Sequence, residues 1–204
     1  MKRNKNTNIY RLSLIFITLI AFLSACETEV TPKPRAYFRI DIPEHQFIAF
    51  DSAFPYQFEY ADNSILKNAQ RPEHPYWLYI DYPHFNARIY LTYNRIENNL
   101  RQMLDDANEM AYKHISVASD IQQNLIILPE QKVYGMIYEI KGQKVASPLN
   151  FYLTDSVNHF MRGSLYFNMM PHNDSLKPVI EGIEKDMQHL IKSFIWNDDS
   201  LTLK

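Results

Sequence analysis

The chain has 204 residues, of which 46% are hydrophobic and 14% aromatic, and its formal net charge is −2. Four basic and no acidic residues lie in residues 1–25, so the rest holds 17 Lys and Arg against 23 Asp and Glu, a formal charge of −6. Such a charge argues against nucleic acid as a partner and against adsorption to anionic lipid. The remaining 179 residues match one domain of ordinary size.

The N-terminal segment has the pattern of a secretory signal that ends at a lipid attachment site. Basic residues precede an apolar run from Leu12 to Ala25, and polar residues follow at once. These regions, in this order, are typical of a signal peptide. The sequence Leu23-Ser24-Ala25-Cys26 resembles a bacterial lipobox, which implies cleavage before Cys26 and lipidation of its sulfur, with palmitate among the acyl groups. We therefore interpret residues 1–25 as a lipoprotein signal peptide.

Two alternatives for Cys26 are a retained membrane anchor and an ordinary cleavage site. The apolar run of 14 residues is shorter than the roughly 20 that a transmembrane helix needs. Ordinary cleavage would leave the chain's one cysteine as an exposed thiol in an oxidising compartment. Both alternatives are less consistent with the sequence than lipidation.

After the cysteine, the chain order predicts a tether and then one domain. Residues 26–35 are polar and contain two prolines, which is typical of a stiffened linker. Residues 36–196 form the predicted domain, which begins with a strand over Tyr37–Ile42. Short apolar pieces follow at Phe47–Phe50 and Tyr56–Tyr60, too irregular to assign, and residues 61–75 are predicted to form a loop.

The middle of the domain has clearer patterns. Tyr76–Tyr82 and Arg88–Tyr93 are aromatic and β-branched runs that predict a hairpin with a five-residue loop. In the second strand, Ile89, Leu91 and Tyr93 share one face, and Arg88, Tyr90 and Thr92 share the other. An amphipathic helix is predicted next, from the stripe Leu100, Met103, Leu104, Ala107, Met110, Ala111 and His114.

The last third predicts three strands and a second helix. The strands are Val133–Ile140, Leu149–Thr154 and His159–Asn168, separated by turn signals. The helix has Ser175 as its predicted N-cap and Pro178 in its first turn. Its apolar stripe consists of Ile180, Ile183, Met187, Leu190, Ile191 and Phe194. Residues 197–204 are predicted to be a polar tail.

This order of strands and helices predicts an α+β fold, an antiparallel β-sheet with two amphipathic helices packed on it. Each helix has one apolar stripe, and a sheet face can cover it. The layout is similar to that of PsbP/Mog1-like domains, a resemblance in topology that implies nothing about function.

The sequence contains no recognisable catalytic motif. It has no G-x-S-x-G, no P-loop and no dinucleotide fingerprint. His74, Asp81 and His84 are the nearest candidate for a metal or catalytic group, but such residues are common in turns. A pair of carboxylates for glycoside cleavage stays open, since such pairs meet only in the fold. We expect no cofactor, no metal and no enzymatic activity.

Aromatic residues beside the predicted loop over residues 61–75 and in the hairpin loop indicate an interaction surface. Tyrosine, tryptophan and arginine are enriched at protein interfaces. The alternative is that these rings fill the core, because large aromatic residues are buried on average. The candidate residues are Arg71, His74, Tyr76, Trp77 and Phe85.

Several stretches resemble a known family, the gliding motility lipoprotein GldD of Bacteroidetes. The first is the segment from Pro32 to Pro43, PKPRAYFRIDIP, directly after the lipobox. The others are YGMIYEI from Tyr134, SPLNFYLTDS from Ser147 and FMRGSLYF from Phe160. The resemblance spans the mature chain and carries no catalytic residue. It implies a cell-envelope lipoprotein that is needed for gliding, in machinery bound up with type IX secretion.

Three hypotheses follow for the function. The first is a non-catalytic accessory or scaffold component of the gliding and type IX secretion apparatus, anchored by the lipid on Cys26 and contacting other envelope proteins. The second is a periplasmic or surface module that binds a small ligand or glycan, and the third is an envelope hydrolase. We expect the protein to be lipid-anchored in the cell envelope, with the outer membrane favoured and the inner membrane the alternative.

The Cys26→Ala variant tests the lipobox. Without the sulfur there is no site for acylation, so we expect loss of both lipidation and membrane retention. Metabolic labelling with radioactive fatty acid, followed by fractionation of the cells, measures both. Labelled variant protein would contradict the assignment.

Overall fold

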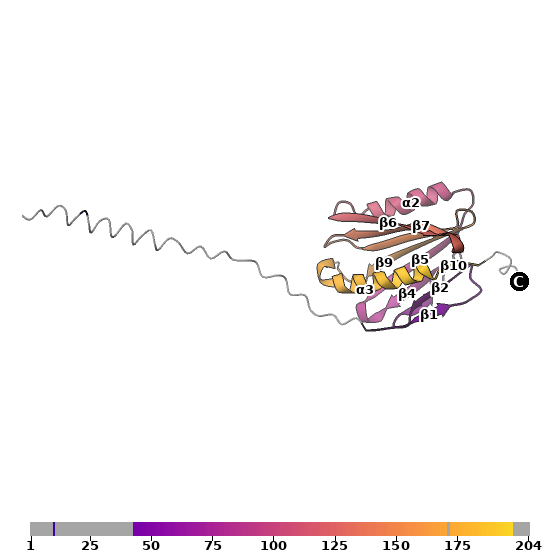
Figure 1. The fold of residues 1–204 in the computed structure, drawn as a ribbon, viewed down its shortest axis with the longest axis horizontal. Helices are drawn as coiled ribbons and strands as arrows, with labels where there is room; N and C mark the ends of the chain where they lie inside the picture. The colour runs from indigo at the N-terminus through magenta and orange to yellow at the C-terminus, as the bar shows by residue number, and fades with distance from the viewer. Residues whose placement is uncertain (1–9, 11–42, 171, 198–204) are drawn as a thin grey trace, which may run out of the picture. The chain divides into compact units, whose positions relative to one another are not determined.

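The computed structural model describes residues 10, 43–170 and 172–197. The predicted signal peptide, Cys26, the tether and the strand over Tyr37–Ile42 lie outside the described residues, as does the tail from residue 198. The fold is α+β, with two helices packed on antiparallel sheet, as the sequence predicts (Figure 1). No helix within the described ranges is long and apolar enough to cross a membrane.

A seven-stranded antiparallel sheet forms the centre of the domain, in the order β3-β4-β5-β9-β8-β7-β6. Its strands in chain order are β3 (Ile65–Asn68), β4 (Leu78–Tyr82), β5 (Ala87–Arg95), β6 (Asp120–Leu128), β7 (Val133–Lys141), β8 (Leu149–Thr154) and β9 (His159–Phe167). The 3₁₀ turns η1 (Pro83–Phe85) and η2 (Pro129–Gln131) connect β4 to β5 and β6 to β7. Only the β5–β9 pair joins strands that are distant in the sequence.

A smaller three-stranded sheet has the order β1-β2-β10. Its strands are β1 (Phe47–Phe50), β2 (Tyr56–Ala61) and β10 (Ile195–Trp196). Both apolar pieces that the sequence left unassigned are therefore strands. The small sheet packs into the core beside a helix, so residues on both faces of β1 and β2 are partly buried. Their sequences therefore lack a regular alternation of apolar and polar residues.

The helices α2 (Leu100–Tyr112) and α3 (Asn173–Lys192) lie on opposite faces of the seven-stranded sheet (Figure 1). Side chains alternate between the two faces of a strand, so Tyr138 and Ile140 of β7 point away from Ile137. Ala111 of α2 packs with Tyr138 and Ile140, whereas Ile137 belongs to the main core, which also holds the apolar stripe of α3. The small sheet packs into that core beside α3.

The main core is made by the face that the sequence assigned to Ile89, Leu91 and Tyr93, all of which are buried. Most of the α3 stripe is confirmed, since Ile183, Met187, Leu190 and Ile191 are buried, with Val179 as an addition. Ile180 is only partly buried, and Phe194 is buried but lies beyond the end of the helix. The α2 stripe is confirmed only in part, because just Ala107 and Ala111 of this helix are buried. The α2 face of the sheet is thus much less covered than the α3 face.

A polar network joins α3 to the strands beneath it. The buried carboxylate of Asp186 accepts a hydrogen bond from the Tyr82 hydroxyl at 3.1 Å and lies 2.8 Å from the ring nitrogen Nε2 of His45. Burial raises the pKa of Asp186, although the nearby His45 and the Tyr82 hydrogen bond oppose this shift. Buried polar groups of this kind persist because they are hydrogen-bonded, and they position α3 against β4.

Three strands were not predicted from the sequence. The predicted loop over residues 61–75 is wrong at β3, which pairs with β4, and neither β6 nor β10 was expected. All three are edge strands, so one side of each backbone lacks a partner strand within its sheet. Edge strands tolerate polar residues, which weakens the alternating pattern that identifies a strand.

The start of α3 also differs from its prediction. The helix begins at Asn173 rather than after Ser175, which places Pro178 in its second turn. The Asn173 side chain donates hydrogen bonds to the carbonyl oxygens of Gly142 and Val145, at 2.9 and 2.8 Å. This anchor to the β7–β8 loop fixes where the helix begins, and no local sequence signal encodes it.

Gly163 makes room for an aromatic ring in the main core. It pairs with Phe151 across β8 and β9, and a Cβ atom at residue 163 would overlap the buried Phe151 ring. The ring therefore lies over the glycine backbone, and the packed core leaves little space for it to move.

We expect Gly163→Ala to lower the free energy of unfolding by about 1–3 kcal/mol, the usual cost of overpacking a core. Denaturant unfolding of the detergent-solubilised protein measures this change. Ser164→Ala is the matched control, because the neighbouring side chain points to the other face and is half-buried. Equal stability of the two variants would contradict the packing argument.

Candidate functional site

The predicted interaction surface is partly assembled at the start of β4. The rings of His74 and Trp77 stack, with centroids 4.0 Å apart and planes within 4°, and the Arg71 guanidinium lies 5.8 Å from the Trp77 ring centroid. The indole N–H of Trp77 donates to the Tyr93 carbonyl oxygen at 2.9 Å. Trp77 is thus half-buried and fixed to β5, so it combines a packing role with limited exposure.

The other two predicted residues do not extend this cluster. Tyr76 packs against the main core, edge-on to Phe54 and Tyr93. Phe85 lies in η1, beyond the opposite end of β4 from Trp77. The five residues therefore do not form one continuous surface.

His74, Asp81 and His84 are not brought together as a metal or catalytic group. Asp81 binds Lys67 and Arg88 instead, while His74 stacks on Trp77. Across the described parts of the chain, no three His, Cys, Asp or Glu side chains converge in a way that could hold a metal ion.

The structure shows a different cluster on the α2 side of the sheet, over β4, β5 and the Tyr166 end of β9. We call the residues Tyr79, Arg88, Tyr90 and Tyr166 the tyrosine–arginine face. The rings of Tyr79 and Tyr90 meet edge to face at 5.0 Å, and those of Tyr90 and Tyr166 at 5.6 Å. All four side chains are partly exposed.

Strand register brings these residues together. Tyr79 pairs directly with Tyr90 across β4 and β5, and Arg88 pairs with Tyr166 across β5 and β9. Directly opposed side chains are close enough to interact, and their neighbours on the diagonal are within reach of aromatic rings. The face therefore depends on three strands being in the correct register.

An ion pair holds the guanidinium on this face. Arg88 donates two hydrogen bonds to the Asp81 carboxylate, and the Lys67 ammonium lies 2.8 Å from the same group. Burial acts to raise the pKa of Asp81, but hydrogen bonds and positive charge from Arg88 and Lys67 hold it below the usual value. The hydrogen bond to Asp81 raises the pKa of Arg88. Both groups are therefore charged at neutral pH.

The fixed guanidinium also contacts the rings. Its carbon atom lies 4.8 Å from the Tyr79 ring centroid and 5.6 Å from that of Tyr90, distances at which a cation is attracted to an aromatic ring. Rings and a guanidinium held in advance lose little side-chain freedom when a partner binds. The arrangement is suited to binding, and the face itself presents no activated nucleophile.

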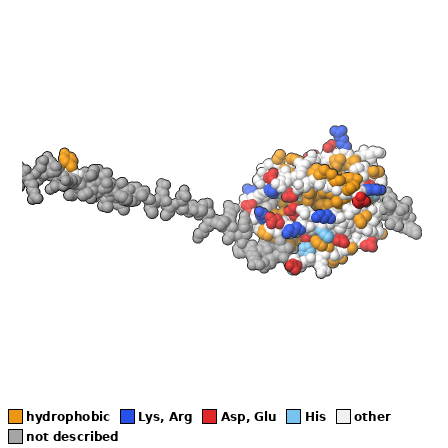
Figure 2. Space-filling view, in the orientation of Figure 1, with side chains coloured by type: hydrophobic (Ala, Val, Ile, Leu, Met, Phe, Trp, Pro, Cys, Tyr) orange, Lys and Arg blue, Asp and Glu red, His pale blue; other side chains and the backbone are white. Residues whose placement is uncertain are grey.

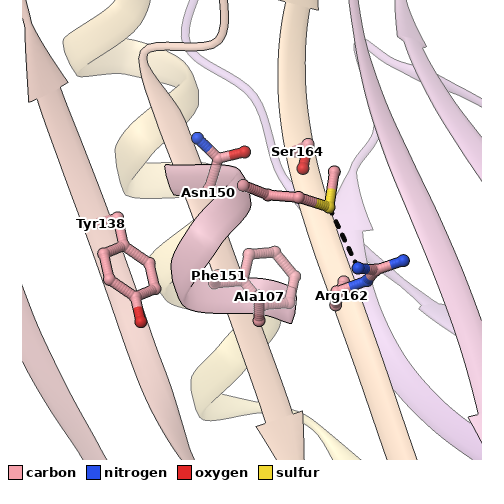
Figure 3. A pocket seen from close by; sticks show the side chains of 7 residues that line it. Ala107, Tyr138, Asn150, Phe151, Arg162 and Ser164 are labelled. Atoms are coloured by element: carbon pink, nitrogen blue, oxygen red, sulfur yellow. Dashed lines mark hydrogen bonds between the residues drawn. The ribbon is translucent and has the colours of Figure 1, made fainter. Parts of the chain in front are cut away.

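A shallow groove continues this surface beneath α2 (Figure 3). It is lined by Ala107, Met110, Tyr138, Asn150, Phe151, Arg162 and Ser164. Arg162 donates a hydrogen bond to the Met110 sulfur at 3.0 Å, and burial raises the pKa of Tyr138 to about 12, so its hydroxyl stays protonated. The cavity volume is about 10 Å³, enough for one water molecule but not for an organic ligand.

Sequence reasoning missed Tyr79 and Tyr166 as surface residues. It did place Arg88 and Tyr90 together on one face of β5, opposite Ile89 and Leu91, and this was the available signal. An arginine and a tyrosine on the exposed face of a central strand are typical of an interaction surface. The pairing of β5 with β9, which adds Tyr166, was not available from the sequence.

The class of this protein follows from its fold, its site and its family. Fold and site together describe an α+β domain with a partly exposed cluster of tyrosine and arginine on one sheet face. Residues 27–196 match the family of the gliding motility lipoprotein GldD, and the chain belongs to that family. It is accordingly a gliding motility lipoprotein, which implies membrane anchoring in the cell envelope.

A solved structure similar to this chain is cyanobacterial PsbP (CyanoP) from Synechocystis sp. PCC 6803, determined in solution. The two share 13% sequence identity with a TM-score of 0.43, over 80% of this chain and 98% of that chain. A likeness at this level carries no functional argument. The chain matches no curated protein.

Asp81→Asn tests the ion pair at the tyrosine–arginine face. Because the pKa of Asp81 is lower in the folded than in the unfolded state, its contribution is present at neutral pH and is lost as the pH falls through the folded-state value. We expect the variant to be less stable by about 1–2 kcal/mol at pH 7, with the difference disappearing in acid. Denaturant unfolding at pH 7 and at a series of decreasing pH values below the ordinary aspartate pKa of about 3.9 measures this.

Asp105→Asn is the control, because the exposed Asp105 pairs with Arg101 at 4.0 Å and such surface pairs contribute little. A stability difference for Asp81→Asn that stays constant with pH would show that the lost charge is not its cause.

Proposed function

We propose that this protein is a non-catalytic accessory component of the gliding and type IX secretion apparatus, held on its membrane by lipid on Cys26. The observation that carries the proposal is the tyrosine–arginine face. It lies on an open side of a rigid sheet and belongs to a chain of the gliding motility lipoprotein family.

The composition of this face favours a protein partner. Tyrosine and arginine are enriched at interface hot spots, where they combine a large contact area with directional hydrogen bonds. The charge of Arg88 is balanced by Asp81, so the face does not require a strongly acidic partner. Other envelope proteins of the gliding and secretion machinery are the proposed partners.

The anchor accounts for the location of the domain. One acyl chain binds a membrane only marginally, whereas several give stable retention, so a processed lipoprotein needs no membrane-spanning helix. We propose the outer membrane as its location, with the inner membrane as the alternative.

Photo-crosslinking in living cells tests the proposed partners. A photoreactive phenylalanine derivative in place of Tyr166 is expected to link the protein to gliding or secretion components, which mass spectrometry identifies. The same replacement at Tyr60, a partly buried tyrosine of the small sheet, is the matched control. Failure to recover any such component from residue 166 would contradict the proposal.

A glycan-binding module is the second candidate, because partly exposed tyrosines on an open sheet face also suit a sugar ring. The crosslinking experiment separates the two candidates. A product that loses its added mass on glycan digestion, with no protein attached, would favour the glycan.

A further inference from the structure

The edge strand β6 is long and exposes apolar side chains in its second half, and no strand among the described residues pairs with its outer side. It ends the seven-stranded sheet, spans nine residues, and exposes Leu125 by 67% and Ile127 by 59%. Figure 2 shows hydrophobic side chains gathered where Figure 1 labels β6 and β7. Natural proteins shorten, charge or cover such edges, because an open strand pairs readily with another chain.

The opposite edge of the same sheet is protected in these ways. The strand β3 has four residues, and it carries Lys67, whose ammonium binds Asp81. By contrast, β6 contains no Lys, Arg or Pro, and its single charged residue, Asp120, lies at its first position. The difference between the two edges indicates that β6 has a partner.

Hydrogen bonding within the sheet shows which backbone groups of β6 are open. The N–H of Ile140 donates to the Pro148 carbonyl oxygen, so Ile140 and alternate residues of β7 bond to β8. The residues between them bond to β6, where Ile137 pairs with Asn124. The N–H and C=O groups of Ile121, Gln123, Leu125 and Ile127 therefore point away from the sheet.

We propose that β6 pairs antiparallel with β6 of a second copy of this chain, about a two-fold axis at Asn124. All four outward residues then find partners, since Gln123 faces Leu125 and Ile121 faces Ile127 of the other copy. Asp120 faces Leu128, so no like charges oppose each other.

In this register the two Asp120 side chains lie at opposite ends of the paired strands, and this compatible charge pattern favours a second copy as the partner. The two-fold axis is perpendicular to the sheet, because edge-to-edge antiparallel pairing of identical strands permits no other direction. The two sheets become continuous, and both tyrosine–arginine faces lie on the same side. Anchoring in one membrane also raises the effective concentration of the two copies.

A disulfide between two copies tests the pairing in full-length, membrane-bound protein. Asn124 would face itself at a non-hydrogen-bonded position, where Cα atoms are about 4.5 Å apart, within the range that a disulfide bridges. Asn124→Cys is expected to form a reducible homodimer on oxidation with copper phenanthroline, whereas the wild type, with Cys26 alone, is not. The readout is non-reducing electrophoresis followed by mass spectrometry.

Two further variants make the result decisive. Lys67→Cys at the protected edge is the matched control and is expected to stay monomeric. In Leu125→Pro, the lost N–H points outward, so β6 keeps its bonds to β7 while the dimer loses two hydrogen bonds. We expect this change to lower the disulfide dimer of Asn124→Cys at least about tenfold, the effect of 1.4 kcal/mol. Only monomer, equal dimer from Lys67→Cys, or a link to a different protein would overturn the proposal.

Discussion

The pairing of β5 with β9 is the constraint on which the rest of the domain depends. Nine residue pairs join Ala87–Arg95 to His159–Phe167, and this ladder connects the β3–β4–β5 unit to the β6–β9 meander. Closing so long a loop costs chain entropy before any contact is gained. The burial of Ile89, Leu91 and Leu165 against α3 offsets that cost. Without this ladder, there is no single sheet for the helices to cover.

The two faces of that sheet are used differently. One is closed by α3 and the small sheet, and its hydrogen-bonded carboxylate at Asp186 positions the helix. The other carries the 13-residue α2, which buries two alanines and leaves β4, β5 and the Tyr166 end of β9 partly exposed. The tyrosine–arginine face lies on this less covered side, where the paired strands hold its side chains in place. The β6 edge lies at the far side of the same sheet, beyond β8 and β7.

Local patterns predicted the strongly periodic elements correctly. The β4–β5 hairpin, strands β7 to β9 and both helices follow from alternation, turn residues and apolar stripes, because a half-buried strand or helix must show its period. β3, β6 and β10 escaped prediction because edge positions impose no such period. The predicted surface around Trp77 was divided for a related reason. Trp77 precedes the five-residue strand β4 and Phe85 follows it, so the two rings lie at opposite ends of that strand.

By itself, the sequence determined the α+β class and the division of β5 into two faces. It also determined membership of the gliding motility lipoprotein family, whose pattern matches residues 27–196. These properties depend on residues that are close together in the sequence, so they do not require knowledge of the tertiary contacts. Only the tertiary structure decided that Tyr79, Tyr90 and Tyr166 meet around Arg88, and that β6 lies at an open edge. Both depend on strand order and register, which are set by long-range backbone pairing and by burial of the shared core.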